Sequence, residues 1–181
     1  MPCKMNHVLS KNTMCQESPA GIGSYAMIIP LDNIASIALK TVPAGADPAE
    51  YAITAAQGQT LKGYEIDFKA QTGQVTSTSN GMGKGFSTTG TGRVELNEEG
   101  FSAMARLLNN FDYYIVAFNC GKDEWYIVGN EEGEVQFSNE SDTGTERSGD
   151  HGHTFTFTCA FQRYPQMKFK GAIDQMDDDS E

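Results

Sequence analysis

A glycine- and hydroxyl-rich segment, TSTSNGMGKGFSTTGTG (residues 76–92), has the composition of a loop that binds phosphate. A P-loop follows the spacing G-x-x-x-x-G-K-[ST], because its backbone N–H groups surround the phosphates and its hydroxyl group binds the metal ion. Lys84 does follow Gly83, but Thr78 stands in place of the first glycine and Gly85 in place of the hydroxyl residue. A phosphate site also needs a helix N-terminus next, whereas the alternating residues that follow predict a strand. The spacing therefore argues against phosphate binding.

A second candidate for chemistry is the fragment Asp150-His151-Gly152-His153, in which two imidazoles and a carboxylate lie within four residues. A strand beginning here would place His151 and His153 on one face, because side chains alternate along a strand. A transition metal needs further ligands, and none can be identified. We therefore predict no metal site and keep Asp150, His151 and His153 only as candidates, with a surface turn as the alternative. The oxygen-rich loop NESDTGTERSGD (139–150) could hold Ca²⁺ but lacks EF-hand spacing.

Side-chain catalysis needs a nucleophile, an acid or a base in a recognisable arrangement. The chain has three histidines, two of them in the fragment above, and no G-x-S-x-G segment that would expose a serine nucleophile. Acidic clusters at 131–134 and 177–179 are interpreted as solvated charge. The sequence therefore predicts neither an enzyme nor a bound cofactor.

Composition limits the class of protein. The 181 residues suffice for one domain, and 24 acidic against 13 basic side chains give a formal charge of −11. That balance argues against general nucleic-acid binding, which needs a basic face. No apolar run reaches the roughly 20 residues of a membrane span, and the N-terminus lacks the apolar core of a secretory signal. We therefore expect synthesis in a cytoplasm.

The four cysteines are expected to stay reduced in that compartment. None stands in the C-x-x-C spacing of a zinc site. Cys120 and Cys159 lie on apolar faces of predicted strands and are interpreted as buried small hydrophobes. Whether Cys3 and Cys15 pair is left open.

Alternation of polar and apolar residues predicts the first strands. SYAMIIPL (24–31) is a strand, DNIASIALK (32–40) is a short strand or an ambiguous apolar run, and TVPAGADPAEY (41–51) is a loop. KGYEIDFKAQ (62–71) alternates throughout. Its inward side is predicted to carry Tyr64, Ile66, Phe68 and Ala70, and its outward side Glu65, Asp67 and Lys69.

Two hairpins and a final strand follow. QVTSTSN (74–80) and GFSTTGTGRVEL (85–96) flank the glycine-rich loop, and YYIVAFNC (113–120) and EWYIVG (124–129) flank a turn at 121–123. GEVQF (133–137) is a short strand, which a polar loop over 138–153 separates from TFTFTCAF (154–161). In this last strand one face is predicted to carry Phe155, Phe157, Cys159 and Phe161.

One amphipathic helix is predicted over NEEGFSAMARLLNNF (97–111), where Phe101, Met104, Ala105 and Leu108 share one face. Asn97 can cap it. The fold expected is a single, mainly β domain: an antiparallel β-sandwich or barrel with this flanking helix and a long Gly/Thr-rich hairpin arm. Residues 1–24 are expected to be irregular and the acidic tail 174–181 flexible.

The order of these elements resembles that of the tail tube proteins of long-tailed bacteriophages and of related prophage or injection-machine tubes. The resemblance is closest at three places and covers roughly residues 15–170. These are Cys15 with Gly21-Ile22-Gly23 and the apolar strand that follows, WYIVGNEEGEV (125–135), and GHTFTFTCAF (152–161).

The resemblance implies a virion structural protein that assembles in the bacterial cytoplasm into hexameric rings, which stack into a hollow tube. The partners would be other copies of the chain and sheath, terminator or baseplate proteins, while DNA would pass without specific binding and no membrane would be involved. In that family a long hairpin loop reaches a neighbouring subunit or ring. The corresponding subunit-interface arm here comprises Asn80, Gly81, Met82, Gly83, Lys84, Gly85 and Phe86.

A negative charge suits a lumen that repels the phosphate backbone. We hypothesise that Glu65 and Asp67 line it; the alternative is that both are ordinary outward residues of a sandwich. The longer N-terminus and the Asp-rich end depart from the family pattern, which leaves open a tail terminator, a hub or a capsid-decorating protein. A different class, a glycan- or ligand-binding β-sandwich, would place its site at Trp125, Tyr126 and the loop 138–153.

Overall fold

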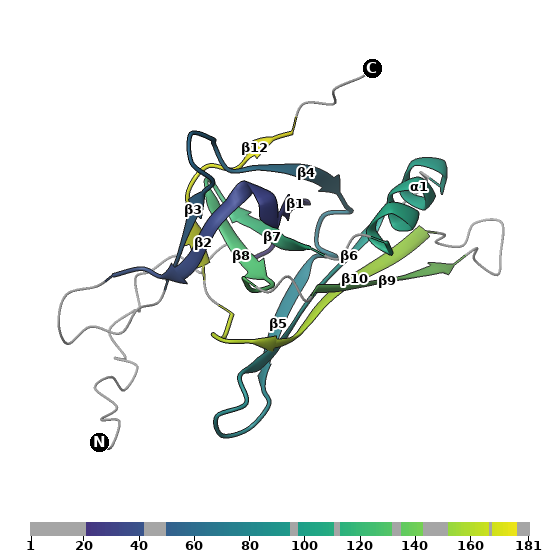
Figure 1. Cartoon of the computed structure of the whole chain (residues 1–181). Coiled ribbons are helices and arrows are strands. Elements are labelled where there is room, and N and C mark those ends of the chain that lie inside the picture. Colours follow the sequence, from purple (N-terminus) through teal and green to yellow (C-terminus); the bar gives the residue numbers. More distant parts are fainter. Residues whose placement is uncertain are drawn as a thin grey trace, which may run out of the picture.

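The computed structural model describes residues 21–41, 50–94, 98–110, 113–131, 135–142, 152–166 and 168–176. Within these ranges the chain forms two β-sheets and one α-helix (Figure 1). The expected mainly β sandwich with one flanking helix is confirmed. Cys3, Cys15, Asp150, His151 and the acidic residues 177–181 lie outside the described residues. The described part of the chain includes no helix with the length and apolarity that crossing a membrane would take.

The larger sheet has, among the described residues, eight strands in the order β12-β4-β1-β7-β8-β11-β3-β2. Neighbours are antiparallel except that β11 runs parallel to β3 and β12 parallel to β4. A short 3-10 helix, η1 (Leu31–Asn33), connects β1 to β2. The strand bounds are Tyr25–Pro30 (β1), Ile34–Leu39 (β2), Glu50–Ala55 (β3), Lys62–Asp67 (β4), Tyr114–Gly121 (β7), Glu124–Val128 (β8), Lys168–Lys170 (β11) and Asp174–Gln175 (β12).

The smaller sheet is antiparallel, with the order β5-β6-β10-β9. Its strands are β5 (Gln74–Ser79), β6 (Phe86–Val94), β9 (Val135–Asp142) and β10 (Gly152–Gln162). The helix α1 (Glu98–Leu108) flanks this sheet, and its Phe101 and Leu108 are buried as predicted. The capping residue expected at Asn97 lies outside the described residues.

Strand β7 is buried on both of its faces, because it serves two hydrophobic cores. Tyr114, Val116 and Phe118 point into the first core, between the two sheets, where aromatic residues of β10 and the helix also lie. Ile115 and Ala117 point into the second core, which is formed mainly by side chains of the larger sheet. The larger sheet therefore curls around a core of its own, and its other side receives the smaller sheet (Figure 1). The near-continuous apolar run in YIVAF follows from this double burial.

Three elements differ from the sequence-based expectation. The strand β3 was missed, because residues 41–51 were assigned to a loop and the segment after it shows little alternation. The strand β9 extends to Asp142 into the predicted polar loop 138–153, since its outward side chains are polar while its backbone pairs with β10. Asp174–Gln175 pairs with β4, so the segment 174–181 begins inside the sheet.

The alternation predicted for β4 holds for Ile66 and Phe68, which are buried, and for Glu65 and Asp67, which are exposed. Tyr64 and Ala70 were predicted to point inward with them, but 48% of the surface of Tyr64 is exposed, and Ala70, beyond the end of the strand, is exposed as well. Ile66 and Phe68 belong to the first core and Tyr64 does not, because the smaller sheet and helix cover β4 only in part.

Five charged side chains form a continuous row of ion pairs across β3, β11 and β8. Glu50 accepts hydrogen bonds from Lys40 and Lys170, each with an N–O distance of 2.8 Å. Glu124 accepts one from Lys168 at 2.9 Å and lies 3.7 Å from Lys170. The hydrogen bonds from Lys170 and Lys40 lower the pKa of Glu50 to about 2. The row therefore holds the short β11 between its two neighbours.

We expect this row to make stability depend on pH in acid. Because the pKa of Glu50 in the fold lies below its ordinary value of 4.5, its ionisation stabilises the fold above that pH, and the contribution is lost as pH falls toward about 2. Glu50→Gln should therefore make the decline in unfolding free energy between pH 5 and 2.5 shallower, as measured by urea denaturation.

Glu65→Gln serves as the control with the opposite sign. Burial raises the pKa of Glu65, and the nearby Asp67 raises it further, so its ionisation costs stability as pH rises through the ordinary carboxyl range. In this variant the unfolding free energy should fall more steeply than in the parent as the pH is lowered. If the unfolding free energy of Glu50→Gln fell with pH as steeply as that of the parent, the role assigned to this row of ion pairs would be contradicted.

Candidate functional site

The glycine-rich loop forms the turn of the β5–β6 hairpin, which projects from the body of the molecule (Figure 1). Gly81, Gly83 and Gly85 have φ angles of 105°, 74° and 74°, values that side chains other than glycine rarely adopt. The loop closes on itself, because the N–H of Asn80 donates to the carbonyl of Gly85 at 3.0 Å. At its tip Met82 is fully exposed. The glycines thus shape a turn, and no helix follows that could complete a phosphate site.

The base of this arm is fixed to the end of β10. The Nδ2 group of Asn80 donates a hydrogen bond to the carbonyl of Ala160 at 2.7 Å. A Cβ atom on Gly85 would lie 2.8 Å from the carbonyl oxygen of Gln162. Only glycine allows this approach, so the position of the arm depends on the geometry of β10.

A β-bulge changes the direction of the side chains there. Phe155, Phe157 and Cys159 are buried as predicted. The register of β10 against β6 then shifts between Cys159 and Gln162. An extra residue reverses the alternation of the strand, so the prediction that Phe161 also points inward is wrong. Phe161 is 66% exposed, and Gln162 takes the buried position.

The bulge places Phe161 beside the arm. Residues of both segments line one shallow concavity. We call its side chains the arm surface: Met82, Lys84, Phe86, Phe161 and Arg163. It combines exposed apolar groups with the ammonium group of Lys84 and includes no carboxylate. Of these residues, the sequence indicated the arm but missed Phe161 and Arg163, because the bulge has no signature in the alternation of TFTFTCAF.

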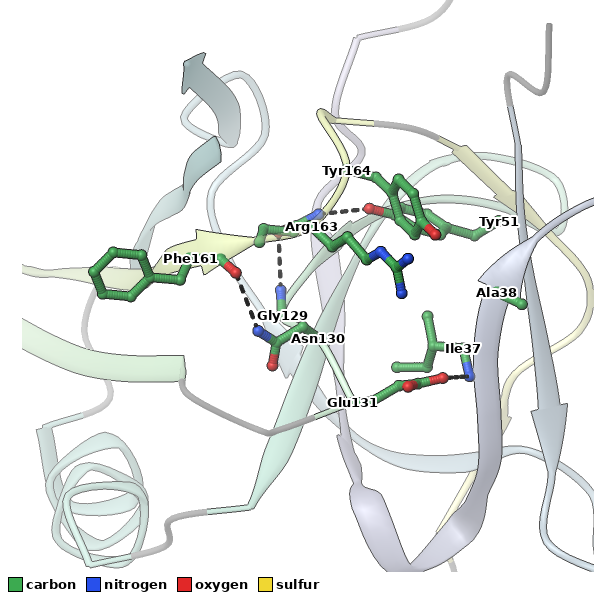
Figure 2. A pocket seen from close by; sticks show the side chains of 10 residues that line it. Ile37, Ala38, Tyr51, Gly129, Asn130, Glu131, Phe161, Arg163 and Tyr164 are labelled. Carbon is green, nitrogen blue, oxygen red and sulfur yellow. Dashed lines mark hydrogen bonds between the residues drawn. The ribbon is translucent and has the colours of Figure 1, made fainter. Parts of the chain in front are cut away.

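On the other side of the bulge lies a cavity of about 320 Å³ between β2, β3 and the end of β10. Figure 2 shows the ring of Phe161 pointing away from it and the guanidinium group of Arg163 pointing into it. That guanidinium group lies 5.4 Å from the centre of the Tyr164 ring. Glu131 accepts a hydrogen bond from the N–H of Ile37, on the edge strand β2, at 3.0 Å.

The floor of this cavity is a closed hydrogen-bond network around Gln162. Its Nε2 group donates to the Tyr51 hydroxyl at 2.8 Å and to the Ile127 carbonyl at 3.4 Å. Its Oε1 atom accepts from the N–H of Gly129 at 3.3 Å. Burial raises the pKa of Tyr51 to about 12, so its hydroxyl stays protonated. The network is thus structural, since Gln162 is buried and both N–H groups of its amide are used inside the fold.

The smaller sheet ends, within the described residues, in two edge strands, β5 and β9. Neither contains lysine or proline, two residues that proteins place on edges to prevent pairing with other chains, but β9 carries the exposed charge of Glu140. The outward face of this sheet carries rows of hydroxyl and amide side chains, and one further row that includes Arg93 and Glu140. Two rows cross all four strands: Gln74, Thr91, Thr156 and Ser138; and Thr76, Thr89, Thr158 and Gln136.

Glu65 and Asp67 lie elsewhere, on β4 of the larger sheet. Both are exposed. Figure 1 shows β4 and β12 at the end of the molecule opposite the arm. The fold therefore brings the two carboxylates close to each other but not to the arm or to the hydroxyl face.

The candidate metal site is described only at His153. The Nδ1 atom of His153 forms a hydrogen bond with the Ser141 hydroxyl at 2.8 Å, and its ring stacks on Phe101 with the centroids 4.7 Å apart. Among the described residues no group of three possible metal ligands comes together. Asp150 and His151 lie outside these residues, so His153 is placed here as a contact between β10 and the helix.

The aromatic residues considered for a glycan site are largely inside the fold. Trp125 is 3% exposed, and its indole N–H donates to the carbonyl of Gly171 at 2.9 Å. Tyr126 is half-buried and lies near the ammonium group of Lys168. A platform for stacking sugars needs an exposed ring, so Trp125 does not provide one.

Comparisons of the chain with protein-family models, with curated proteins and with solved structures found no match. Function is therefore inferred from the geometry of the chain and from the order of its elements.

Proposed function

We propose that this chain is a non-enzymatic virion structural protein that assembles into stacked, hexameric rings of a phage tail tube. The observation that carries the proposal is the smaller sheet, which ends within the described residues in two edge strands, β5 and β9, on opposite sides. Exposed edges pair readily with other chains. If β5 of one copy pairs with β9 of the next, the sheets join, and a closed ring leaves no edge exposed.

The outward face of such a joined sheet would line the conduit. Its two full rows carry only hydroxyl and amide groups. Hydroxyl groups can exchange hydrogen bonds with phosphate oxygens without the long-range attraction that lysine and arginine exert. In this arrangement DNA moves through without specific binding. The conduit is then lined by the smaller sheet, and Glu65 and Asp67 belong to another surface.

The arm supports the same proposal, because it projects beyond the edge strand β5 and ends in a fully exposed methionine. Large apolar side chains at the tip of a projecting hairpin are typical of a contact with another subunit. The rival glycan-binding function is less well supported, since its proposed aromatic platform includes the buried Trp125.

Assembly is tested by negative-stain electron microscopy and light scattering of the purified protein over a concentration series. We expect rings or tubes with a central hole. A variant lacking residues 80–86 should give a folded protein that fails to polymerise, with folding checked by circular dichroism. Because that deletion removes the closure of the hairpin, Met82→Asp is the second variant, which changes only an exposed side chain.

The proposal predicts that Met82→Asp raises the protein concentration needed for polymer formation at least about tenfold, because a charge at an apolar contact costs more than about 1.4 kcal/mol. The matched control is Leu107→Asp on the outer side of the helix, where the parent side chain is 71% exposed. Unchanged tubes in both arm variants would rule out the arm as an assembly contact. A monomer at all concentrations in the parent would count against the tube itself.

A further inference from the structure

The cavity between β2, β3 and the end of β10 is lined by one cation and one anion, Arg163 and Glu131. Its floor is occupied by hydrogen bonds of the fold itself, through Gln162 and Tyr51. Its volume of about 320 Å³ is at the lower end of the range of roughly 300–1,000 Å³ that ligand pockets span. The cavity therefore has room for a small molecule, and its two charges are the groups that would orient one.

The guanidinium group of Arg163 points into this cavity (Figure 2). Its contact with the ring of Tyr164, 5.4 Å from the ring centre, favours this orientation. No carboxylate in the described part of the chain forms a salt bridge with it. A guanidinium group presents its N–H donors as a planar fork, which matches the two oxygens of a carboxylate. This end of the cavity therefore suits a carboxylate.

Glu131 is held at the cavity by the edge strand β2. One of its carboxylate oxygens accepts a hydrogen bond from the N–H of Ile37 at 3.0 Å, and among the described residues the other oxygen has no donor. In the view of Figure 2, the side chain of Ile37 lies between the carboxylate of Glu131 and the guanidinium group of Arg163. The two charges form no salt bridge with each other. The second oxygen of Glu131 therefore suits an ammonium group.

These two charges favour a ligand that carries both signs. The formal charge of −11 repels free anions, and the guanidinium group repels free cations from its end of the cavity. A zwitterion has no net charge, and it can pair with both groups at once. The side chain of Ile37 and the ring of Tyr164, which also line the cavity, offer apolar contact to the rest of such a molecule.

We propose that this cavity binds a small zwitterionic amino acid, with its carboxylate on Arg163 and its ammonium group on Glu131. Two kinds of molecule share this chemistry: an α-amino acid with an apolar side chain, and an ω-amino acid with its charges at the two ends of an apolar chain. The inference goes beyond the proposed function and does not depend on it, because the cavity lies within one copy of the chain.

Equilibrium dialysis of the full chain against radiolabelled ligands measures binding whether the protein is monomeric or assembled. Leucine and ε-aminocaproate represent the two kinds of zwitterion. Each is compared with the same molecule lacking one charge: isocaproate and isoamylamine for leucine, caproate and hexylamine for ε-aminocaproate. We expect one zwitterion to bind with a Kd of about 1 mM or lower, and each of its analogues to bind at least about tenfold more weakly.

Two variants separate the roles of the charged groups. Arg163→Gln removes the partner of the carboxylate, so the zwitterion should bind at least about tenfold more weakly. Glu131→Gln keeps an oxygen for the N–H of Ile37 but loses the negative charge. In this variant the zwitterion and the amine-free acid should bind with similar affinity, a change of preference that a purely structural role of Glu131 would not produce.

Arg106→Gln is the control, because Arg106 is exposed on α1 and does not line the cavity. It should bind the zwitterion like the parent. Circular dichroism establishes that each variant is folded.

Saturable binding of either zwitterion that is lost in Arg163→Gln and kept in Arg106→Gln supports the site. The site is overturned if neither zwitterion binds the parent at about 10 mM, ten times the expected Kd. It is also overturned if the amine-free acid binds the parent as tightly as the zwitterion, or if folded Arg163→Gln binds like the parent. A parent that forms tubes but binds no zwitterion would retain the proposed function and lose this site, and one that binds without assembling would do the reverse.

Discussion

Replacing Phe157 by alanine is expected to lower the free energy of unfolding by about 3–5 kcal/mol. Phe157 is completely buried in the first core. Its ring lies against four other aromatic rings, with centroid distances of 5.2–6.5 Å. These rings come from two other strands, β7 and β9, and from β10 itself, and they cannot all move inward, so the alanine leaves a cavity. The partners are Tyr114, Phe118, Phe137 and Phe155.

Phe161→Ala is the matched control, since it makes the same change on the same strand beyond the bulge. That side chain is 66% exposed, so its removal should change the unfolding free energy by less than about 1 kcal/mol. Urea denaturation followed by the fluorescence of Trp125 measures both variants. Similar losses for the two would mean that the bulge is absent and that Phe161 points inward.

Gln162→Leu is expected to cost about 2–4 kcal/mol, although leucine is apolar and of similar size. The substitution leaves the buried N–H of Gly129 and the carbonyl of Ile127 without the hydrogen bonds that Gln162 now supplies. It also removes the hydrogen bond that the Tyr51 hydroxyl accepts from Gln162, although this hydroxyl still donates to the carbonyl of Pro165. A buried polar group without a partner costs about 1–3 kcal/mol, and here several are affected at once.

Gln136→Leu on β9 is the corresponding control, because this glutamine is exposed. Its unfolding free energy should stay within about 0.5 kcal/mol of the parent. Thermal and urea unfolding of both variants provide the comparison. A Gln162→Leu variant as stable as the parent would show that the network around the cavity contributes little to the fold.

The parts of the fold that could be predicted from sequence are those with a strong local period. The helix was found because Phe101 and Leu108 recur on one of its faces, and the β7–β8 hairpin because apolar residues are dense on both sides of a short turn. In each case local spacing and tertiary burial agree. The prediction of a sandwich with one helix follows from the order of these elements.

The parts that failed depend on contacts between distant segments. The strand β3 lies between the nearby β2 and the distant β11, which follows more than a hundred residues later, and nothing in the sequence of β3 indicates this second partner. The bulge of β10 is set by the approach of Gly85 to Gln162 and by the hydrogen bond from Asn80. The prediction from local alternation therefore continued past the bulge and wrongly placed Phe161 inside the fold.

For the candidate site, the sequence identified the arm but not what lies beside it. Glycine spacing located Asn80–Phe86, while Arg163 joins the same surface only because the bulge brings the end of β10 to the arm. One signal was present: the absence of acidic residues from two separate segments, 68–94 and 151–173, could have linked them. The position of Glu65 and Asp67 in the fold could not be predicted, because the sequence does not show which strands border β4.

The double burial of β7 has a consequence for how the molecule comes apart. Any opening that detaches the smaller sheet exposes one side of β7, and any opening of the curled sheet exposes the other. Partial unfolding on either side therefore weakens the strand that holds the opposite side in place. We infer that the two cores melt as one cooperative unit, with the amide protons of β7 among the slowest to exchange with solvent. A chain built in this way can bend its arm and edges while its centre stays intact.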